Sequence, residues 1–374
     1  MGPDMVLSGQ VVRTKGLRVS AANKEMKVTS KRIESPEYVK MSHATAISLG
    51  LVKGRMYRGA VNRCVNLLVH YPEGCSANCA YCGLARRRPG TYEEKSFIHV
   101  EWPIFPINEV VDAINKAPQY VKRTCISMIT NGKCREDTLV LARRLKEETF
   151  MPISVLISPT IIEKEDLIAM KEAGVDKVGV AIDLATPELF DRYRGVGVSG
   201  PHRWEKYWEI LISALEVFGN LEVGAHLMVG MGETEREMVS LLERMREMGV
   251  VNHLFSFFAE ESSSLAARPQ PPWSQYLRVQ MARYLIEHEK SCLDNINFDG
   301  LGRIIDFGVA PHRLKEIINL GAPFMTTGCL GPDGKVACNR PFGNCLPDVK
   351  QWNYPYLPND EELTLIHENI FKMG

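Results

Sequence analysis

The stretch ISVLISPTIIEKEDLIAMKEAGVDKVGVAI, residues 153–182, contains one complete strand–helix–strand unit. Its apolar runs at 153–158 and 177–182 have the length and the β-branched content of buried strands. The stretch 164–174 between them has a helical pattern and closes with Gly174, a residue typical of the position after a helix end. Because a helix joins the two strands, they are expected to lie parallel in one sheet.

The same pattern recurs along the central part of the chain. Further strands are predicted at 64–70, 125–130, 222–229 and 253–258, and further helices at 137–148, 204–219 and 235–249. Six strand–helix units favour an α/β fold of the partial (β/α)6 TIM type over a closed eightfold barrel. Ligands are then expected at the carboxyl ends of the strands.

The ends of the chain differ from this repeating region. Residues 1–62, which include the alternating stretch VVRTKGLRVS, are predicted to form an N-terminal β-ribbon and helix extension, and residues 63–265 to form the barrel. A Pro- and Ser-rich stretch, SSSLAARPQPPW, precedes a predicted helix at 274–290. Residues 266–374 are therefore expected to be a C-terminal appendage built around a metal site.

The composition narrows the class of partner and the compartment. The 45 Lys and Arg residues balance 45 Asp and Glu residues, which argues against a nucleic-acid binder or a binder of anionic membranes. No apolar run approaches the roughly 20 residues that span a bilayer, and the start MGPDMVLSGQ lacks a signal core. A cytoplasmic protein is expected, in which ten cysteines indicate metal binding or redox chemistry.

Three cysteines lie close together after the first predicted strand of the barrel. Cys75, Cys79 and Cys82 fall in VNLLVHYPEGCSANCAYCGLARRRPG, residues 65–90. Thiolates are soft ligands for iron, and three of them on a 4Fe-4S cluster leave one iron without a protein ligand. A structural zinc site would need a fourth ligand nearby, and a disulfide framework would need a secreted protein. The loop is therefore predicted to hold a catalytic 4Fe-4S cluster.

This loop resembles the signature of the radical S-adenosylmethionine (radical SAM) superfamily, Cys-x3-Cys-x2-Cys with an aromatic residue before the last cysteine. The matching residues are Cys75, Cys79, Tyr81 and Cys82. The resemblance implies that S-adenosylmethionine chelates the open iron and is cleaved by an electron from the cluster to a 5′-deoxyadenosyl radical that abstracts hydrogen. It also implies an electron donor of the ferredoxin or flavodoxin type.

Two downstream segments resemble biotin synthase and its relatives, a likeness that extends from about Cys64 to Phe258. HLMVGMGET, with Gly230 and Glu233, resembles a turn near the cofactor in that group, although a tight structural turn would look the same. VAIDLATPELFDRYRG resembles the segment whose Asp binds the ribose of the cofactor. That residue is Asp183 here, and a helix cap is its alternative role.

The second strand end resembles the place where relatives bind the amino group of the cofactor. Ser127, Thr130 and Asn131 occupy that place in ISMITNG. The carboxylate of the cofactor needs a cation, for which Lys206 is the candidate and His202 and Arg203 are alternatives. Each of these three could equally be a solvated charge at a helix start.

The segment FIHVEWP either lines the active site or forms an ordinary loop.

A second triplet, Cys329, Cys338 and Cys345, lies in the loop-like stretch TTGCLGPDGKVACNRPFGNCLP. Such a loop can wrap an auxiliary 4Fe-4S cluster with a fourth ligand from elsewhere. A zinc knuckle completed by His312 or a distant cysteine is the alternative. The isolated Cys64, like Cys292, is predicted to be a buried small residue and not a ligand.

The position of the second triplet separates this chain from biotin synthases and bacterial lipoyl synthases. Biotin synthases hold an internal 2Fe-2S cluster through three cysteines and an arginine, and the corresponding positions fall here at Cys125, near Val155 and near Gly224. Bacterial lipoyl synthases use an N-terminal cysteine motif, whereas the first 62 residues here contain no cysteine. The chain resembles instead the biotin-synthase-related proteins that include archaeal-type, two-component lipoyl synthases.

This resemblance implies a particular reaction and particular partners. The radical would abstract hydrogen from C6 or C8 of an octanoyl chain on a lipoyl-domain or glycine-cleavage carrier protein, the auxiliary cluster would supply sulfur, and a second radical SAM subunit would perform the other insertion. One alternative is modification of a peptide or small metabolite without sulfur insertion. Another is a non-catalytic iron-sulfur protein for redox sensing or assembly.

Overall fold

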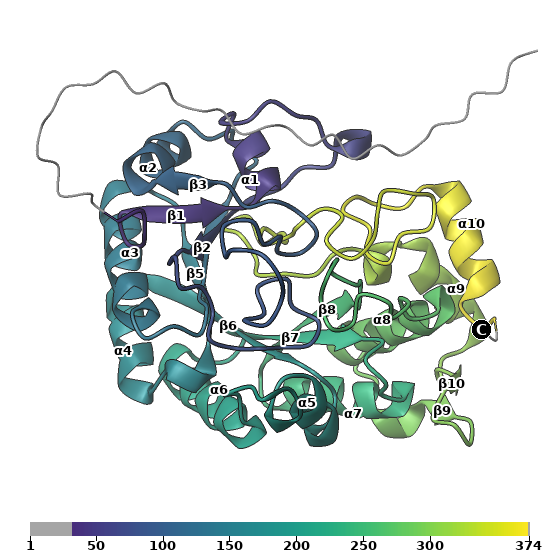
Figure 1. Cartoon of the computed structure of the whole chain (residues 1–374). Helices are drawn as coiled ribbons and strands as arrows, with labels where there is room; N and C mark the ends of the chain where they lie inside the picture. Colours follow the sequence, from purple (N-terminus) through teal and green to yellow (C-terminus); the bar gives the residue numbers. More distant parts are fainter. Residues whose placement is uncertain (1–31, 373–374) are drawn as a thin grey trace, which may run out of the picture. The chain divides into compact units, whose positions relative to one another are not determined.

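The computed structural model describes residues 32–372, of which 33 onward belong to one compact unit that runs to the end of the chain (Figure 1). The boundaries predicted at 62/63 and 265/266 both fall inside this unit. The predicted ribbon around VVRTKGLRVS lies outside the described residues.

The described strands form one large sheet and one small one. The large sheet has eight strands in the order β3-β1-β2-β4-β5-β6-β7-β8, and β9 pairs with β10. The strands are β1 (Tyr38–Met41), β2 (Cys64–Val69), β3 (Ile104–Pro106), β4 (Arg123–Ser127), β5 (Ile153–Ile157), β6 (Val175–Asp183), β7 (Val223–Val229), β8 (Val251–Ser256), β9 (Asn297–Phe298) and β10 (Ile304–Asp306).

The helices alternate with the strands over the central part of the chain. They are α1 (His43–Ser48), α2 (Ile107–Asn115), α3 (Cys134–Glu148), α4 (Lys164–Glu172), α5 (Pro187–Tyr193), α6 (Trp204–Phe218), α7 (Glu235–Glu247), α8 (Trp273–His288), α9 (Pro311–Asn319) and α10 (Asp360–Asn369). Short 3-10 turns lie at Tyr57–Gly59, Pro159–Ile161, Val196–Val198, Leu293–Asn295 and Ala322–Phe324. In Figure 1, α3, α4 and α6 lie along the outer side of the curved sheet.

The fold class predicted from the sequence is confirmed. Strands β2 and β4 to β8 are parallel neighbours, which gives the six parallel strands of a partial barrel. The predicted extension does not form a ribbon of its own in the described residues, because β1 pairs antiparallel with both β2 and β3 and so extends the main sheet. The sheet therefore continues beyond β2 with β1 and then β3.

The core explains why these segments form these elements. All six residues of β2 are buried, as expected for a parallel strand covered on both faces. Helix α7 buries one stripe that includes Met238, Leu242 and Met245 and begins with a capping box between Thr234 and Glu237. None of the helices between residues 32 and 372 combines the length and the apolar character that crossing a membrane requires.

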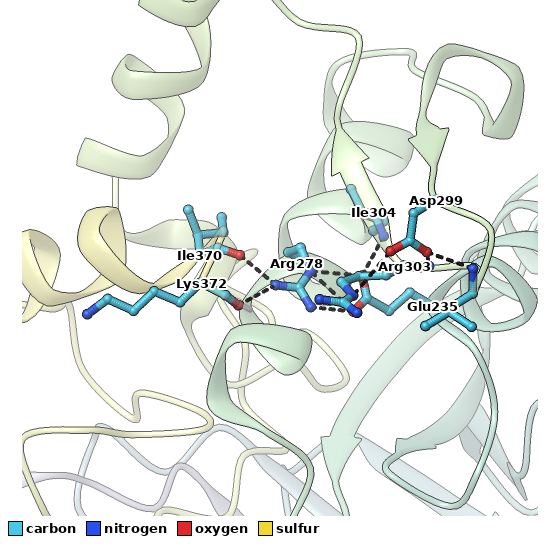
Figure 2. A network of polar contacts seen from close by, with 8 residues as sticks. Glu235, Arg278, Asp299, Arg303, Ile304, Ile370 and Lys372 are labelled. Carbon is cyan, nitrogen blue, oxygen red and sulfur yellow. Dashed lines mark hydrogen bonds and ion pairs between the residues drawn. The ribbon is translucent and has the colours of Figure 1, made fainter. Parts of the chain in front are cut away.

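A buried ion pair ties α7 to the C-terminal part of the unit. The guanidinium of Arg278, on α8, donates to both carboxylate oxygens of Glu235, at the start of α7. Figure 2 shows Arg278 reaching in the other direction to the carbonyl oxygens of Ile370 and Lys372, at 2.9 and 3.4 Å from its Nη1. Glu235 also accepts from the backbone N–H of Ile304 at 2.8 Å. The pair therefore connects α8, β10 and residues 370–372 to the start of α7.

Candidate active site

A cavity of about 230 Å³ lies at the carboxyl ends of the parallel strands. The loop after β2 contributes Cys75, Cys79 and Cys82 to its lining. The other walls come from the ends of the remaining strands, including Thr130 after β4 and Asp183 at the end of β6. This is the edge at which barrels of this type bind their ligands.

Backbone contacts fix the cysteine loop against the neighbouring strand. Both the N–H and the hydroxyl of Ser76 donate to the carbonyl oxygen of Thr130, each at 2.8 Å. The side-chain amide of Asn131 donates to the carbonyl oxygen of Gly74 at 3.1 Å. Gly74 has a φ of +71° and a Cβ there would lie 2.7 Å from the Tyr92 ring, so the turn requires glycine.

The three thiols line one cavity and have the ligand chemistry of an iron-sulfur cluster. No group of three or more His, Cys, Asp or Glu side chains in residues 32–372 is arranged to hold one metal ion. In an iron-sulfur cluster each thiolate binds an iron of its own, so the ligands need only face a common space. Burial raises the pKa of the Cys79 thiol to about 12, with the charge of Arg194 acting against that rise, and metal binding would supply the charge that keeps such a thiol deprotonated.

A hydrogen-bonded group of three side chains connects the cysteine loop to the end of β6. The phenol of Tyr81 donates to Oδ2 of Asp183 at 2.6 Å, and Nη1 of Arg194 donates to the same oxygen. Asp183 has a φ of +65°, a left-handed conformation that non-glycine residues adopt at a cost, and the β6–β7 register shifts at this point. The backbone therefore bends where it presents this carboxylate to the cavity.

His202 lines the cavity next to this group of three and is a neutral side chain. Its Nδ1 lies 2.6 Å from the hydroxyl of Thr160 and 3.1 Å from that of Tyr207. Burial, together with the nearby charge of Arg194, lowers the pKa of His202 to about 2. His202 can therefore take part in hydrogen bonds but cannot supply a cation for a carboxylate at neutral pH.

The other two cation candidates lie apart from the cavity lining. The ammonium of Lys206 pairs with Glu163 at 2.7 Å and with Glu209 at 2.8 Å, on the outside of the barrel. The guanidinium of Arg203 donates to backbone carbonyl oxygens that include the one of His202. Lys206 is therefore placed away from the site for which it was predicted, because its position in the first turn of α6 faces neighbouring acids. Arg194 is the buried cation beside Asp183.

Of the other residues predicted to bind the cofactor, some line the cavity and some form hydrogen bonds within nearby turns. Thr130 lines the cavity, whereas Ser127 and Asn131 are not part of the lining. The carboxylate of Glu233 accepts from the backbone N–H groups of Gly230, at 2.7 Å, and Met231, at 2.9 Å. Burial raises the pKa of Glu233 to about 7. The carboxylate of Glu233 thus stabilises its own turn through hydrogen bonds to the backbone. These contacts are those of a tight structural turn, the alternative role given above for this segment.

The segment FIHVEWP forms one wall of the cavity. His99 has a φ of +61°, stacks on Phe258 with 3.9 Å between ring centroids, and its Nε2 lies 2.9 Å from the Phe258 carbonyl oxygen. Its backbone N–H donates to Oε1 of the buried Glu260 at 2.8 Å. Glu260 in turn accepts from the hydroxyl of Ser96 at 2.9 Å. This wall shields the cavity on the side of the cysteine loop.

The second cysteine triplet is divided by the fold. The sulfur of Cys338 lies 3.8 Å from the side-chain nitrogen of Asn66 on β2, and the thiols of Cys64, Cys125 and Cys329 are close enough to act on the pKa of Cys338. Cys345 points elsewhere: its thiol donates to Oε1 of Gln351 at 3.2 Å. The grouping of Cys345 with Cys329 and Cys338 followed their spacing alone, and the turn after Cys338 directs Cys345 toward a different part of the core.

Several cavity residues had not been singled out from the sequence. They are Arg194, Glu260, His226 and Arg340. Arg194 lies in the quoted segment VAIDLATPELFDRYRG, and Arg340 lies between Cys338 and Cys345. Nothing in the local sequence distinguishes these charges from surface charges, since their burial depends on contacts made across the barrel.

Comparison with known proteins agrees with this site. Residues 69–245 match the family described as the radical SAM superfamily. The chain is 27% identical over 214 residues to a biotin synthase of Desulforudis audaxviator, covering 55% of this chain and 59% of that one. It is 25% identical over 179 residues to a biotin synthase of Persephonella marina, covering 47% and 48%. The chain thus spans about half the length of the curated relatives it matches.

The chain accordingly contains a domain of the radical SAM superfamily, residues 69–245. Within that superfamily it is related to the biotin synthase branch. Membership implies a 4Fe-4S cluster and S-adenosylmethionine as cofactors, and the cavity is lined by three thiols of one loop and by the carboxylate of Asp183. Cys75, Cys79 and Cys82 would hold the cluster.

Solved structures give partial likenesses. HydG, a maturase of the [FeFe]-hydrogenase, aligns with a TM-score of 0.46 at 13% identity over 61% of this chain and 51% of that one. The radical S-adenosylmethionine methyltransferase TsrM from Kitasatospora setae aligns with a TM-score of 0.39 at 15% identity over 62% and 42%.

Proposed function

We propose that this enzyme abstracts hydrogen from an unactivated carbon of a protein-bound octanoyl chain, and that a C–S bond with sulfur from an auxiliary cluster replaces each C–H bond broken. The observation that carries the proposal is a cavity that combines the three cysteines of the loop with a largely apolar set of strand-end side chains. The carrier would be a lipoyl-domain or glycine-cleavage protein, and a second radical SAM subunit would perform the other insertion.

The cavity walls favour an aliphatic substrate. Its apolar lining includes Leu68, Met128, Ile129, Leu156, Ile157, Met228, Phe255 and Phe258. Burying the hydrocarbon part of an octanoyl chain here would contribute roughly 5 kcal/mol, at about 0.8 kcal/mol per methylene. A charged peptide segment would gain little from such walls and would lose hydration on entering.

The residues around the cavity have separable tasks in this reaction. When bound, the cluster and S-adenosylmethionine supply a 5′-deoxyadenosyl radical, which takes a hydrogen atom from the substrate. Asp183 offers a carboxylate to the ribose hydroxyls, and Tyr81 and Arg194 hold that carboxylate in place. The wall formed by His99 and Phe258 excludes water, a stray hydrogen donor, from the radical.

Replacing Asp183 with Asn tests the ribose contact. The substitution keeps the size of the side chain but removes the charge that receives Tyr81 and Arg194, so we expect the KM for S-adenosylmethionine to rise by about 10- to 100-fold, as for loss of a charge-assisted hydrogen bond of roughly 1.5–3 kcal/mol. Iron content should not change. The measurement is the rate of 5′-deoxyadenosine formation against cofactor concentration. A KM equal to that of the parent would refute the contact.

The function itself is tested with an octanoyl-lysine peptide. The anaerobically reconstituted and reduced enzyme is incubated with the peptide and S-adenosylmethionine, and products are followed by mass spectrometry. Addition of sulfur to the peptide together with 5′-deoxyadenosine supports the proposal. Formation of 5′-deoxyadenosine without sulfur addition, under conditions where the peptide binds, favours the alternative of peptide or metabolite modification. Absence of cofactor cleavage favours a non-catalytic iron-sulfur protein.

A further inference from the structure

Two cysteines of neighbouring parallel strands face the inside of the barrel. Cys64 begins β2, and Cys125 on β4 pairs in register with Asn66. Side chains two residues apart on a strand share a face, and Leu68 of the same series lines the cavity. Cys64 and Cys125 therefore point to the barrel interior, and both are buried.

A hairpin from the C-terminal segment brings two more thiols to the same place. Its ends are Cys329 and Cys338, whose backbones are joined by a hydrogen bond of 3.0 Å from the N–H of Cys338 to the carbonyl oxygen of Cys329. A Cβ on Gly328 would lie 1.8 Å from the Cys338 carbonyl oxygen, so the approach of the two arms requires glycine. The sulfur of Cys338 lies 3.8 Å from the side-chain nitrogen of Asn66, which is two residues from Cys64 on β2 and in register with Cys125 on β4.

Two arginines anchor this hairpin to the strands that carry the first two cysteines. Arg123, at the start of β4, donates from Nε to the carbonyl oxygen of Leu330 at 2.9 Å and pairs with both carboxylate oxygens of Asp176, at 2.5 and 2.8 Å. Arg63, just before β2, donates to the carbonyl oxygen of Val336 at 2.8 Å. The hairpin is therefore fixed at the amino ends of β2 and β4.

The surroundings of the four thiols suit bound thiolates. The charge of Arg340 acts on Cys338, Cys125 and Cys64, and would offset the negative charge of a thiolate-bound cluster. Nε2 of His253 lies 3.8 Å from the Cys329 sulfur, and its Nδ1 is buried without a hydrogen-bond partner among the described residues. A Cβ on Gly224 would lie 2.5 Å from this Nε2, so glycine makes room for the imidazole.

We infer that Cys64, Cys125, Cys329 and Cys338 are the ligands of the auxiliary iron-sulfur cluster, and that Cys345 is not. The role of that cluster as the sulfur donor rests on the proposed function, whereas its position and its ligands do not. Arg340 lines the substrate cavity and also lies beside the thiols. The cluster would thus adjoin the cavity, with the substrate between it and the cysteine loop.

Two simpler explanations fit the site less well. Cysteines that serve only as small apolar residues do not need a guanidinium beside them, and Cys329 and Cys338 are only half-buried. A mononuclear zinc site would hold a single ion in a tetrahedral array of four ligands, and the metal count in the test below distinguishes it from a cluster. Four thiolates that each bind one iron satisfy a 4Fe-4S cluster without a further ligand.

The test counts iron and sulfide in three variants of the full chain after anaerobic reconstitution. The first replaces Cys64, Cys125, Cys329 and Cys338 with Ala, and the second is the matched control Cys345→Ala. The third replaces Cys75, Cys79 and Cys82 with Ala, so that its Mössbauer spectrum reports the auxiliary site alone. Alanine is close to cysteine in size, and circular dichroism checks that each variant is folded.

We expect about eight irons in the parent and in Cys345→Ala, and about four in each multiple variant, since each 4Fe-4S cluster carries four. The third variant should give the spectrum of one 4Fe-4S cluster, which disappears when Cys338→Ala and Cys125→Ala are added to it. Loss of iron in Cys345→Ala with retention in the first variant would overturn the inference. So would one zinc per chain, or a Cys64–Cys338 disulfide without metal.

Failure of this inference can be told apart from failure of the proposed function. If the auxiliary site holds four irons but the octanoyl-lysine peptide gains no sulfur, the ligand set stands and the substrate assignment fails. If the peptide gains sulfur while the first variant keeps all of its iron, the function stands and the ligand set is wrong. The first variant should still form 5′-deoxyadenosine, because Cys75, Cys79 and Cys82 are intact in it.

Discussion

Replacing Cys79 with Ala is expected to remove the cofactor chemistry altogether. Cys79 is the most enclosed thiol of its loop, at 7% exposure, and a cluster left with two thiolates there would lose its place on the protein. We expect 5′-deoxyadenosine formation to fall by more than about 10³-fold, since the step depends wholly on the bound cofactor. The reduced enzyme is incubated with S-adenosylmethionine, and the 5′-deoxyadenosine formed is quantified by chromatography.

Iron content distinguishes loss of the cluster from misfolding. The variant should lose about four irons, the content of one 4Fe-4S cluster, while its circular dichroism matches the parent. Cys292→Ala is the matched control, because Cys292 lies on a surface turn where its thiol bonds only to its neighbour Asn295, at 3.0 Å. Full cofactor cleavage by Cys79→Ala would contradict the assignment of the loop.

The largest effect on stability is expected for Arg278→Met. Arg278 and Glu235 have side chains 4% and 5% exposed, and removal of one partner leaves a buried charge uncompensated. Such losses cost about 3–5 kcal/mol, so we expect the free energy of unfolding to fall by that amount. The contacts to Ile370 and Lys372 would be lost as well (Figure 2). Urea titration followed by circular dichroism measures the change.

A double variant separates the charge from the packing. Glu235→Gln combined with Arg278→Met removes both charges, so it should be less destabilised than the sum of the single variants. Arg313→Met is the control, since the pair of Arg313 with Glu289 lies at the surface and such pairs contribute little. Equal stability of Arg278→Met and the parent would show that the buried pair does not fasten the C-terminal segments.

The sequence predicts the barrel well because its signals are local. The six parallel strands and the helices between them follow from apolar runs and from helix-end signals such as Gly174, which act within a few residues. The loop with Cys75, Cys79 and Cys82 is predictable for the same reason, since all its ligands come from one turn. These elements keep their identity wherever the rest of the chain lies.

The contacts that the sequence could not predict all join distant parts of the chain. Arg194, at the end of α5, is a cavity residue that pairs with Asp183 of β6, and Lys206 is held by Glu163 and Glu209 outside the cavity lining. The spacing in the sequence groups Cys345 with Cys329 and Cys338. In the fold, the register of β2 and β4 decides instead which thiols lie near one another. Side-chain direction, which local patterns do not encode, decides each case.

The two cysteine sites also differ in the order in which a ribosome completes them. The loop from Cys75 to Cys82 has all its thiols within eight residues, early in synthesis. The other four thiols cannot meet until residue 338 has left the ribosome, when the six parallel strands already exist and can fold. The hairpin must then dock at the amino ends of β2 and β4, so the second site is finished last.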